Sequence, residues 1–213
     1  AAGLTSGLLV TRLAINPFIA TLAVMVVVRG AIRAYTGTRP VVGLEEGFLA
    51  LGGGDPVPYA FLLMALILLS LHIALATRPW GRHVYAVGAD ARVATMAGLR
   101  TNRIRIGTYV LSGALAGLAG MFLAARLGTG SPIVGDATPL TAAAAALIGG
   151  ATLKGGEGSI LGAACGLLFI GTLVNVMSLL GVQSYYQHMA IGGLLIALVV
   201  SDGLAVRLRD RAT

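Results

Sequence analysis

The sequence predicts an all-α fold, a polytopic transmembrane helical bundle with about six membrane segments. Of its 213 residues, 57% are hydrophobic and only 11% are charged, whereas a soluble domain carries about 25% charged residues. The run VPYAFLLMALILLSLHIALA (57–76) contains no Asp, Glu, Lys or Arg, and about 20 mostly apolar residues are enough to cross the hydrocarbon core. We therefore expect a single transmembrane domain over residues 1–213.

The apolar runs divide the chain into six candidate segments, whose ends are predicted to within about two to four residues. The fourth contains PLTAAAAALIGG, which is short of the roughly 20 residues that a straight crossing needs. A full crossing and a re-entrant or strongly kinked helix, with its backbone buried by other helices, are both open for it. The segments are 15–34, 57–77, 106–127, 138–150, 159–181 and 186–206.

The basic residues predict the orientation. The net charge is +7, but the arginines gather in loops and at the C-terminus, so membrane topology explains them better than nucleic-acid binding does. If the loop 78–105 is cytoplasmic, eleven of the fifteen Lys and Arg lie inside and four lie outside. Six crossings then place the C-terminus in the cytoplasm as well. The four outside residues are Arg29, Arg33, Arg39 and Arg126.

Two glycine pairs within the segments have the spacing that lets helix backbones approach closely. They are Gly113 with Gly117, and Gly162 with Gly166. We expect them to pack helices of one bundle together, with a dimer contact as the alternative. The single cysteine, Cys165, lies in an apolar run, so no disulfide can form within the chain.

The longest polar insert, GRHVYAVGADARVATMAGLRTNRIR (81–105), separates two apolar runs. Pro79 is expected to stop the helix before it. Trp80 and Tyr85 are aromatic residues of the kind that anchor spans in the headgroup layer. The insert therefore begins at the membrane surface.

A two-turn helix is predicted inside this insert. Asp90 is a good N-cap and Gly98 a good C′ residue, and Val93, Met96 and Ala97 form one apolar stripe between them. So short a helix is not stable alone in water. It either lies on the membrane surface or on its own bundle, or it docks in a groove on a cytoplasmic partner.

Residues 81–120, GRHVYAVGADARVATMAGLRTNRIRIGTYVLSGALAGLAG, resemble the signature region of the integral permeases of ribose-type sugar ABC importers, which include ribose, xylose, arabinose and galactoside carriers. Five further motifs resemble the same family in the expected order. They are NPFIATLAVMVVVRG (16–30), YTGTRPV (35–41), ARLGTGSP (125–132), LIGGATLKGGEGSILG (147–162) and LLGVQSYYQ (179–187).

The resemblance implies a role for the insert. In the family, the loop similar to ADARVATMAGL is a coupling helix that seats in a cleft of the cytoplasmic ATPase. Carried onto this sequence, the small positions of that loop are Ala91, Ala94 and Gly98. The residues that would contact the ATPase are Arg92, Thr95 and Met96.

The resemblance also implies the partners. They are cytoplasmic ABC ATPase subunits, a second permease subunit in a homodimer, an extracytoplasmic solute-binding protein and the inner membrane of a bacterium. ATP and Mg²⁺ would bind in the ATPase. Family permeases have further spans before the first motif, and this chain begins AAGLTSGLLV without an initiator Met or signal peptide. We therefore expect a fragment.

No catalytic or cofactor site is predicted. GGATLKGGEGS (149–159) is not a phosphate-binding loop, because Lys154 precedes Gly155 instead of following the final glycine. It is read as a tight glycine turn, so ATP hydrolysis must occur in another subunit. We see no constellation of catalytic residues and expect no metal site, since the three histidines are scattered: His72, His83 and His188.

A solute path is predicted from polar side chains within the segments, because such groups are costly in a membrane and tend to face a cavity. For Ser and Thr, a hydrogen bond back to the same helix is the favoured alternative. Asn16 and Asn175 are the stronger candidates, and Thr21 is included with them. The remaining candidates are Ser112, Thr141 and Ser178.

The predicted function is therefore the permease subunit of an ATP-driven importer that moves a ribose-like sugar by alternating access. The same architecture could instead import nucleosides, branched-chain amino acids or a signalling furanose. An amino-acid carrier should show charges or helix N-termini near mid-membrane, and no clear charge is found there. A channel or scaffold without an ATPase partner is the alternative of another class; it would not need a docking helix.

Overall fold

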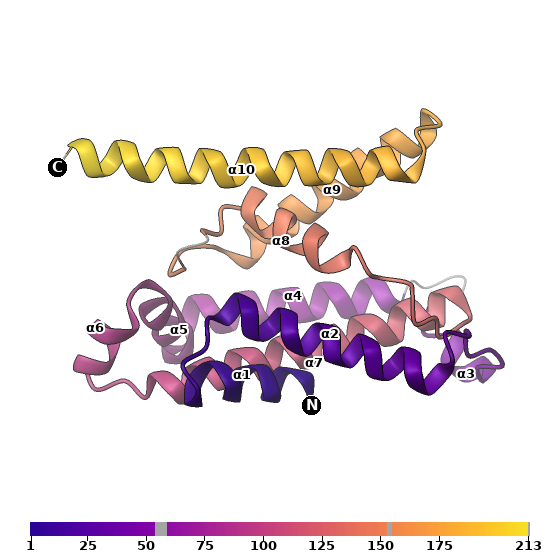
Figure 1. Cartoon of the computed structure of the whole chain (residues 1–213), viewed down its shortest axis with the longest axis horizontal. Helices are drawn as coiled ribbons and strands as arrows, with labels where there is room; N and C mark the ends of the chain where they lie inside the picture. Colours follow the sequence, from indigo (N-terminus) through magenta and orange to yellow (C-terminus); the bar gives the residue numbers. More distant parts are fainter. Residues whose placement is uncertain (54–58, 153–154, 213) are drawn as a thin grey trace. The chain divides into compact units, whose positions relative to one another are not determined.

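A computed structural model describes residues 1–53, 59–152 and 155–212, and these residues form helices joined by short loops (Figure 1). The only extended pairing within them is an isolated bridge between Val41 and Gly130. The all-α fold class is thus confirmed. The helices are α1 (Ala2–Arg12), α2 (Pro17–Thr36), α3 (Glu46–Leu49), α4 (Tyr59–Thr77), α5 (Pro79–Ala89), α6 (Ala91–Met96), α7 (Thr101–Leu127), α8 (Thr138–Ile148), α9 (Ile160–Leu179) and α10 (Ser184–Ala212).

Each of the six predicted segments contains a helix, and four of these are long and apolar enough to cross a membrane, counted over the described residues: α2, α4, α7 and α9. The described apolar part of α10, Ser184–Val200, is shorter than these four helices. Helix α8 has 11 residues, a length of about 16 Å at 1.5 Å per residue. That is about half of the hydrocarbon core, so the expectation of a short fourth segment is confirmed.

The helices differ from the prediction in three places. Helix α4 ends at Thr77, before Pro79, as predicted, but Pro79 then occupies the first turn of a further helix, α5, after Arg78 in extended conformation (φ −87°, ψ 149°). Proline fits there because the first N–H of a helix has no partner within it. Residues 101–105, assigned to the loop, belong to α7. Helix α1 was not predicted, although its Gly3 and Gly7 have the spacing of close-packed helices.

Some predicted residues cannot be compared with the structure. Lys154 lies outside the described residues, and so do the side chains of Arg207, Arg209 and Arg211.

The chain divides into two compact units, each of which is described by itself. The first comprises Ala1–Ser70 and Ala91–Val134, and the second comprises Leu71–Asp90 and Gly135–Thr213. This division does not test the predicted single transmembrane domain over residues 1–213, which stays a prediction.

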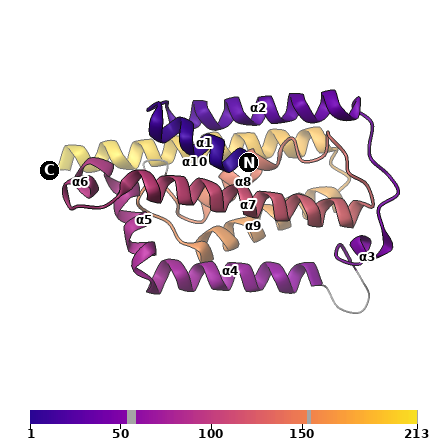
Figure 2. The ribbon, with the colours of Figure 1, turned by 90° about the horizontal axis from the view of Figure 1, so that it is seen from below.

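In the first unit, α1 packs against α7 and α2 (Figure 2). The approach is close because glycines meet backbone. A Cβ atom at Gly3 would overlap the carbonyl group of Tyr109, and one at Gly113 would lie 2.9 Å from Gly3 Cα. Close packing at Gly113 is thus confirmed. At Gly117 a Cβ would meet none of the described atoms within 4 Å, so the expected packing within the bundle is not found among the described residues, and the dimer contact stays a prediction.

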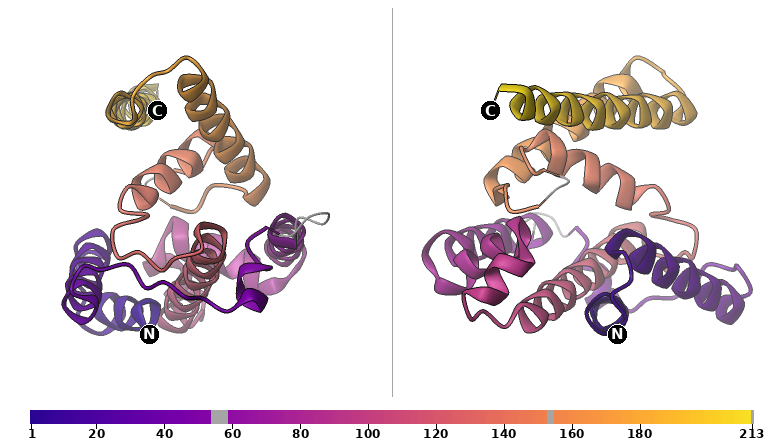
Figure 3. Two further views of the ribbon diagram at one scale, coloured as in Figure 1. Left: turned by 90° about the vertical axis from the view of Figure 1, so that its right-hand side faces the viewer. Right: turned by 60° about the vertical axis from the view of Figure 1, so that its left-hand side comes forward.

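In the second unit, α8 packs on α9, and α10 contacts both helices (Figure 3). A Cβ at Gly162 would overlap the carbonyl oxygen of Gly149, and one at Gly166 would overlap that of Ala145. The predicted role of this pair in helix packing is confirmed. The buried cluster at this crossing consists of Ala144, Ala145 and Ile170. The partly buried side chains packed against it are Ile148, Val174, Ile191 and Leu195.

Candidate functional site

The predicted two-turn helix of the polar insert is α6. Its C-terminal end is closed by Gly98, which has a φ of +82°. The Gly98 N–H donates to Thr95 O at 2.9 Å and the Leu99 N–H to Ala94 O at 3.1 Å. These two bonds are the Schellman motif, which needs a residue in the left-handed conformation at C′. The helix and the position of Gly98 are therefore confirmed.

The start of α6 also agrees with the prediction. Asp90 directly precedes it, with extended backbone angles (φ −152°, ψ 111°) that are typical of an N-cap residue. At the other end, Thr95 Oγ1 donates to Ala91 O at 2.7 Å and lies 3.3 Å from Thr101 Oγ1. This second contact ties α6 to the first turn of α7.

Helix α6 buries one small side chain and leaves its apolar stripe uncovered. Ala94 is 4% exposed, whereas Val93 is 62% and Met96 87% exposed. Arg92 and Thr95 are exposed as well. Ala94 is the residue that faces the unit, and its small size suits the contact of α6 with α7. The stripe is thus available to a surface outside the described chain.

A contact that the sequence did not predict lies within the second unit, between α5 and the glycine loop 155–158. The Tyr85 Oη atom donates to Gly158 O at 2.9 Å. A Cβ at Gly88 would lie 2.8 Å from Gly156 N, and one at Gly155 would lie 2.7 Å from Gly88 O. We call these five residues the clasp. Its three loop glycines have positive φ angles of +88°, +79° and +143°, which explains the glycine-rich sequence there.

The path candidates do not lie in one unit. Asn16 and Thr21 are at the start of α2 in the first unit, and Asn175 is exposed on α9 in the second. Asn16 Oδ1 accepts from the Phe18 N–H at 2.9 Å, so it caps α2. Thr21 Oγ1 lies 3.0 Å from Pro17 O, which is the favoured alternative of a bond to its own helix. A role of the three in the path stays a prediction.

The other polar candidates follow a similar pattern. Thr141 Oγ1 donates to Ala137 O at 3.2 Å and Ser178 Oγ to Val174 O at 2.9 Å, while Ser112 is exposed on α7. No group of three His, Cys, Asp or Glu side chains that could hold a metal occurs among the residues the structure describes.

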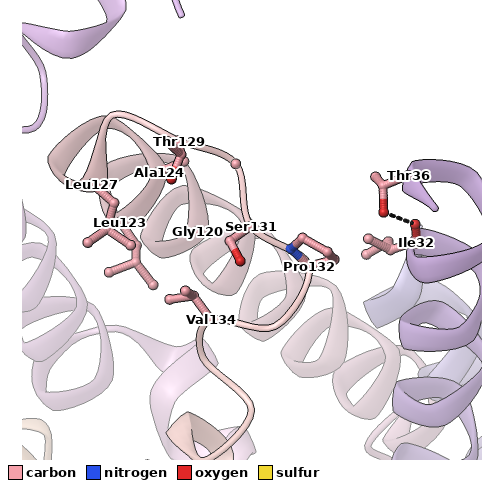
Figure 4. Close-up of a pocket in the computed structure, with 11 residues that line it drawn as sticks. Ile32, Thr36, Gly120, Leu123, Ala124, Leu127, Thr129, Ser131, Pro132 and Val134 are labelled. Atoms are coloured by element: carbon pink, nitrogen blue, oxygen red, sulfur yellow. Dashed lines mark hydrogen bonds between the residues drawn. The ribbon is translucent and has the colours of Figure 1, made fainter. Parts of the chain in front are cut away.

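A pocket of about 330 Å³ lies in the first unit, between the C-terminal parts of α2 and α7 and the loop 129–134 (Figure 4). Its polar groups are few, and the Thr36 hydroxyl already donates to Ile32 O at 2.9 Å. The Ser131 hydroxyl accepts from the Ile133 N–H at 3.4 Å. A sugar buried here would leave hydroxyl groups without partners, which is costly. The pocket is therefore a poor solute site.

Apolar helices long enough to cross a bilayer, with a short helix between two of them whose Val93 and Met96 are mostly exposed, define a polytopic membrane protein. Residues 1–199 match the model of a family described as the branched-chain amino acid transport system / permease component, and the chain belongs to this family. No solved structure matches the chain.

Three curated relatives are sugar permeases by name. The chain is 40% identical to the ribose import permease protein of Bacillus subtilis (strain 168) over 203 residues, which are 92% of this chain and 62% of that protein. It is 37% identical to the ribose import permease protein of Escherichia coli (strain K12), covering 95% of this chain and 65% of that protein. It is 36% identical to the D-allose transport system permease protein of the same strain, covering 96% and 63%.

Proposed function

We propose that this chain belongs to the permease subunit of an ATP-driven importer that carries a ribose-like sugar across a bacterial inner membrane. The observation that carries the proposal is its similarity to ribose and allose permeases over 92–96% of its length. The chain spans 62–65% of the length of these relatives, so the activity is proposed for the complete permease.

The exposed stripe of α6 supports an ATPase partner. Burying a Met or Val side chain is worth about 1.5–3 kcal/mol, and Val93 and Met96 are both mostly exposed. A cytoplasmic ATPase with an apolar cleft would bury them, with Arg92 and Thr95 at the edge and Ala91, Ala94 and Gly98 allowing close approach. The ATPase would bind ATP and Mg²⁺, and this chain would contribute no catalytic residue.

We propose that this contact with the ATPase drives alternating access. A ligand shifts a conformational equilibrium only when it binds two states with different affinity. ATP binding would therefore change how α6 is held and so favour the inward-open or the outward-open state. Two permease subunits would enclose the path, and a solute-binding protein would deliver the sugar from outside. Asn16, Thr21 and Asn175 remain our candidates for the path.

The family description names branched-chain amino acids, which is the second candidate cargo. A zwitterion in the path would need a charge or a helix N-terminus near mid-membrane. The middle of α9, GAACGLLFIGTLVN, and that of α4 carry no charged side chain. A neutral solute suits these helices better.

Uptake by the complete transporter tests this function. The full permease, its ATPase and its solute-binding protein would be reconstituted in proteoliposomes and supplied with radiolabelled ribose, arabinose, allose, leucine or adenosine. ATP-dependent uptake of a sugar is the expected result. Uptake of only leucine or only adenosine would show that the cargo is that solute and not a sugar. Flux without ATP would indicate a channel.

A further inference from the structure

The clasp joins α5 to the glycine loop by two independent kinds of contact. One is the part-buried hydrogen bond between the Tyr85 hydroxyl and Gly158 O, which links residues 73 positions apart. The other is direct backbone packing, in which Gly88 and Gly156 approach so closely that a single added Cβ would lie 2.8 Å from the Gly156 nitrogen. Backbone packed on backbone cannot yield by rotating a side chain, so this contact is stiff.

The chain continues from the two sides of the clasp into two further helices, α6 and α9. On one side, α5 ends at Ala89, and α6 begins only two residues further along the chain. On the other side, the loop leads into Ser159, whose Oγ accepts from the Gly162 N–H at 2.9 Å and caps α9. Helix α9 in turn packs on α8 through Gly162 and Gly166.

The other end of α5 is held equally closely. The Gly81 N–H donates to Arg78 O at 3.1 Å, and a Cβ at Gly81 would overlap the Leu75 carbonyl group of α4. Gly81 and Val87 are buried. Helix α5 therefore makes close backbone contacts near both of its ends within the second unit.

We propose that the clasp passes a displacement of the coupling helix α6 to the α8–α9 pair, with Tyr85 as a positioning residue. The proposal rests on the proposed function, since it needs an ATPase that displaces α6. Energetic coupling is carried by packed, rigid elements, and the clasp provides such a connection between α5 and the start of α9. When the clasp is weakened, ATP hydrolysis should continue while less solute is moved for each ATP.

The first test is Tyr85→Phe, which removes only the hydroxyl, with Tyr35→Phe as the matched control. Tyr35 is 94% exposed on α2. Both variants would be made in the full permease, assembled with its ATPase and binding protein in proteoliposomes. We expect the solute moved per ATP to fall about two- to tenfold in Tyr85→Phe, the range set by one lost hydrogen bond, and to stay unchanged in Tyr35→Phe.

The second test is Gly88→Ala, with Gly107→Ala as its control. Alanine stabilises a helix relative to glycine, so each change favours its own helix. Only at Gly88 does the new Cβ meet backbone, since at Gly107 it finds no described atom within 4 Å. We expect the amount of solute moved per ATP hydrolysed to fall in Gly88→Ala and to stay unchanged in Gly107→Ala.

The outcomes separate this proposal from the function on which it rests. If the unmodified transporter shows no ATP-driven uptake, the proposed function fails and the clasp proposal fails with it. If the unmodified transporter works and Tyr85→Phe keeps the same ratio as Tyr35→Phe, only the clasp proposal is overturned. A fall in assembled transporter with an unchanged ratio would likewise overturn it, because that pattern describes a merely structural contact.

Discussion

Helices α6 and α8 solve the same problem differently. With 6 and 11 residues, both are too short to be stable alone in water. Each ends in a Schellman motif, at Gly98 and Gly150, with φ angles of +82° and +87°. Yet α8 buries Ala144 and Ala145 against its own chain, while α6 leaves Met96 87% exposed.

The two helices gain their stability from different surfaces. The face of α8 is made of alanines that admit the glycines of α9 at backbone distance, so its partner lies within the described chain. The face of α6 carries larger apolar side chains that are mostly exposed, Val93 and Met96. We infer that α8 is a structural element, whereas the proposed function makes α6 a docking element, and four substitutions test this contrast.

The largest effect is expected at the α8–α9 contact. Gly166→Val would place side-chain atoms on the Ala145 carbonyl and force the helices apart, which should cost at least about 2 kcal/mol. The midpoint of thermal unfolding in detergent should fall by about 4–8 °C. Gly171→Val on the same helix, where a Cβ meets no described atom within 4 Å, should change it little. Equal shifts in both variants would contradict the structural role of α8.

The next effect is expected at the end of α6. In Gly98→Leu, the new side chain has open space but must adopt a φ of +82°, which costs about 1–2 kcal/mol. ATP-driven uptake should fall about tenfold while membrane insertion stays normal, because no packing is lost. Gly98→Asn is the control, since Asn tolerates this conformation. Normal uptake in Gly98→Leu would argue against a coupling role for α6.

A smaller effect is expected for the stripe itself. Met96→Ala should weaken binding of the ATPase about three- to tenfold, because less apolar surface would be buried. Met189→Ala, on α10 and also mostly exposed, should leave that affinity unchanged. Titration of the ATPase onto the detergent-solubilised permease measures both. If the Met96 variant binds as tightly as the parent, α6 rests on the membrane surface instead.

The smallest perturbation tests only the side of the membrane on which α6 lies. In a background in which the exposed Cys165 is replaced by serine, Thr101→Cys should react with a membrane-impermeant maleimide from the cytoplasm only. Glu45→Cys, beyond α2 in the predicted outer loop, should react from outside only. Labelling of Thr101→Cys from outside would reverse the orientation inferred from the arginines.

Much of this contrast could be predicted from the sequence. Hydrophobic runs are local, so all six segments were found, and the caps of α6 are encoded by Asp90 and Gly98 at its two ends. Helix α5 is not predicted because Pro79 marks the end of α4, and the sequence does not show that the same proline also begins a new helix. The pairing of Tyr85 with Gly158 was missed because no local pattern records a contact between residues so distant in the chain.

Among the path candidates, sequence reasoning identified polar residues but not their partners. Asn16 was chosen because an amide in an apolar run needs an explanation. The structure offers a local one in the cap of α2, and Thr21 has a local partner as well. Asn175 has no such local explanation among the described contacts, and its place on α9 keeps it as the clearest of the three.

The cap at Asn16 has a consequence for the depth of α2. Its side-chain oxygen satisfies the Phe18 amide, and Pro17 has no amide hydrogen to satisfy. The first four backbone N–H groups of a helix have no partner within it. In α2, two of these four therefore need no hydrogen bond from water. The start of α2 therefore needs fewer hydrogen bonds from water than an uncapped start, which lowers the cost of placing it deeper in the membrane.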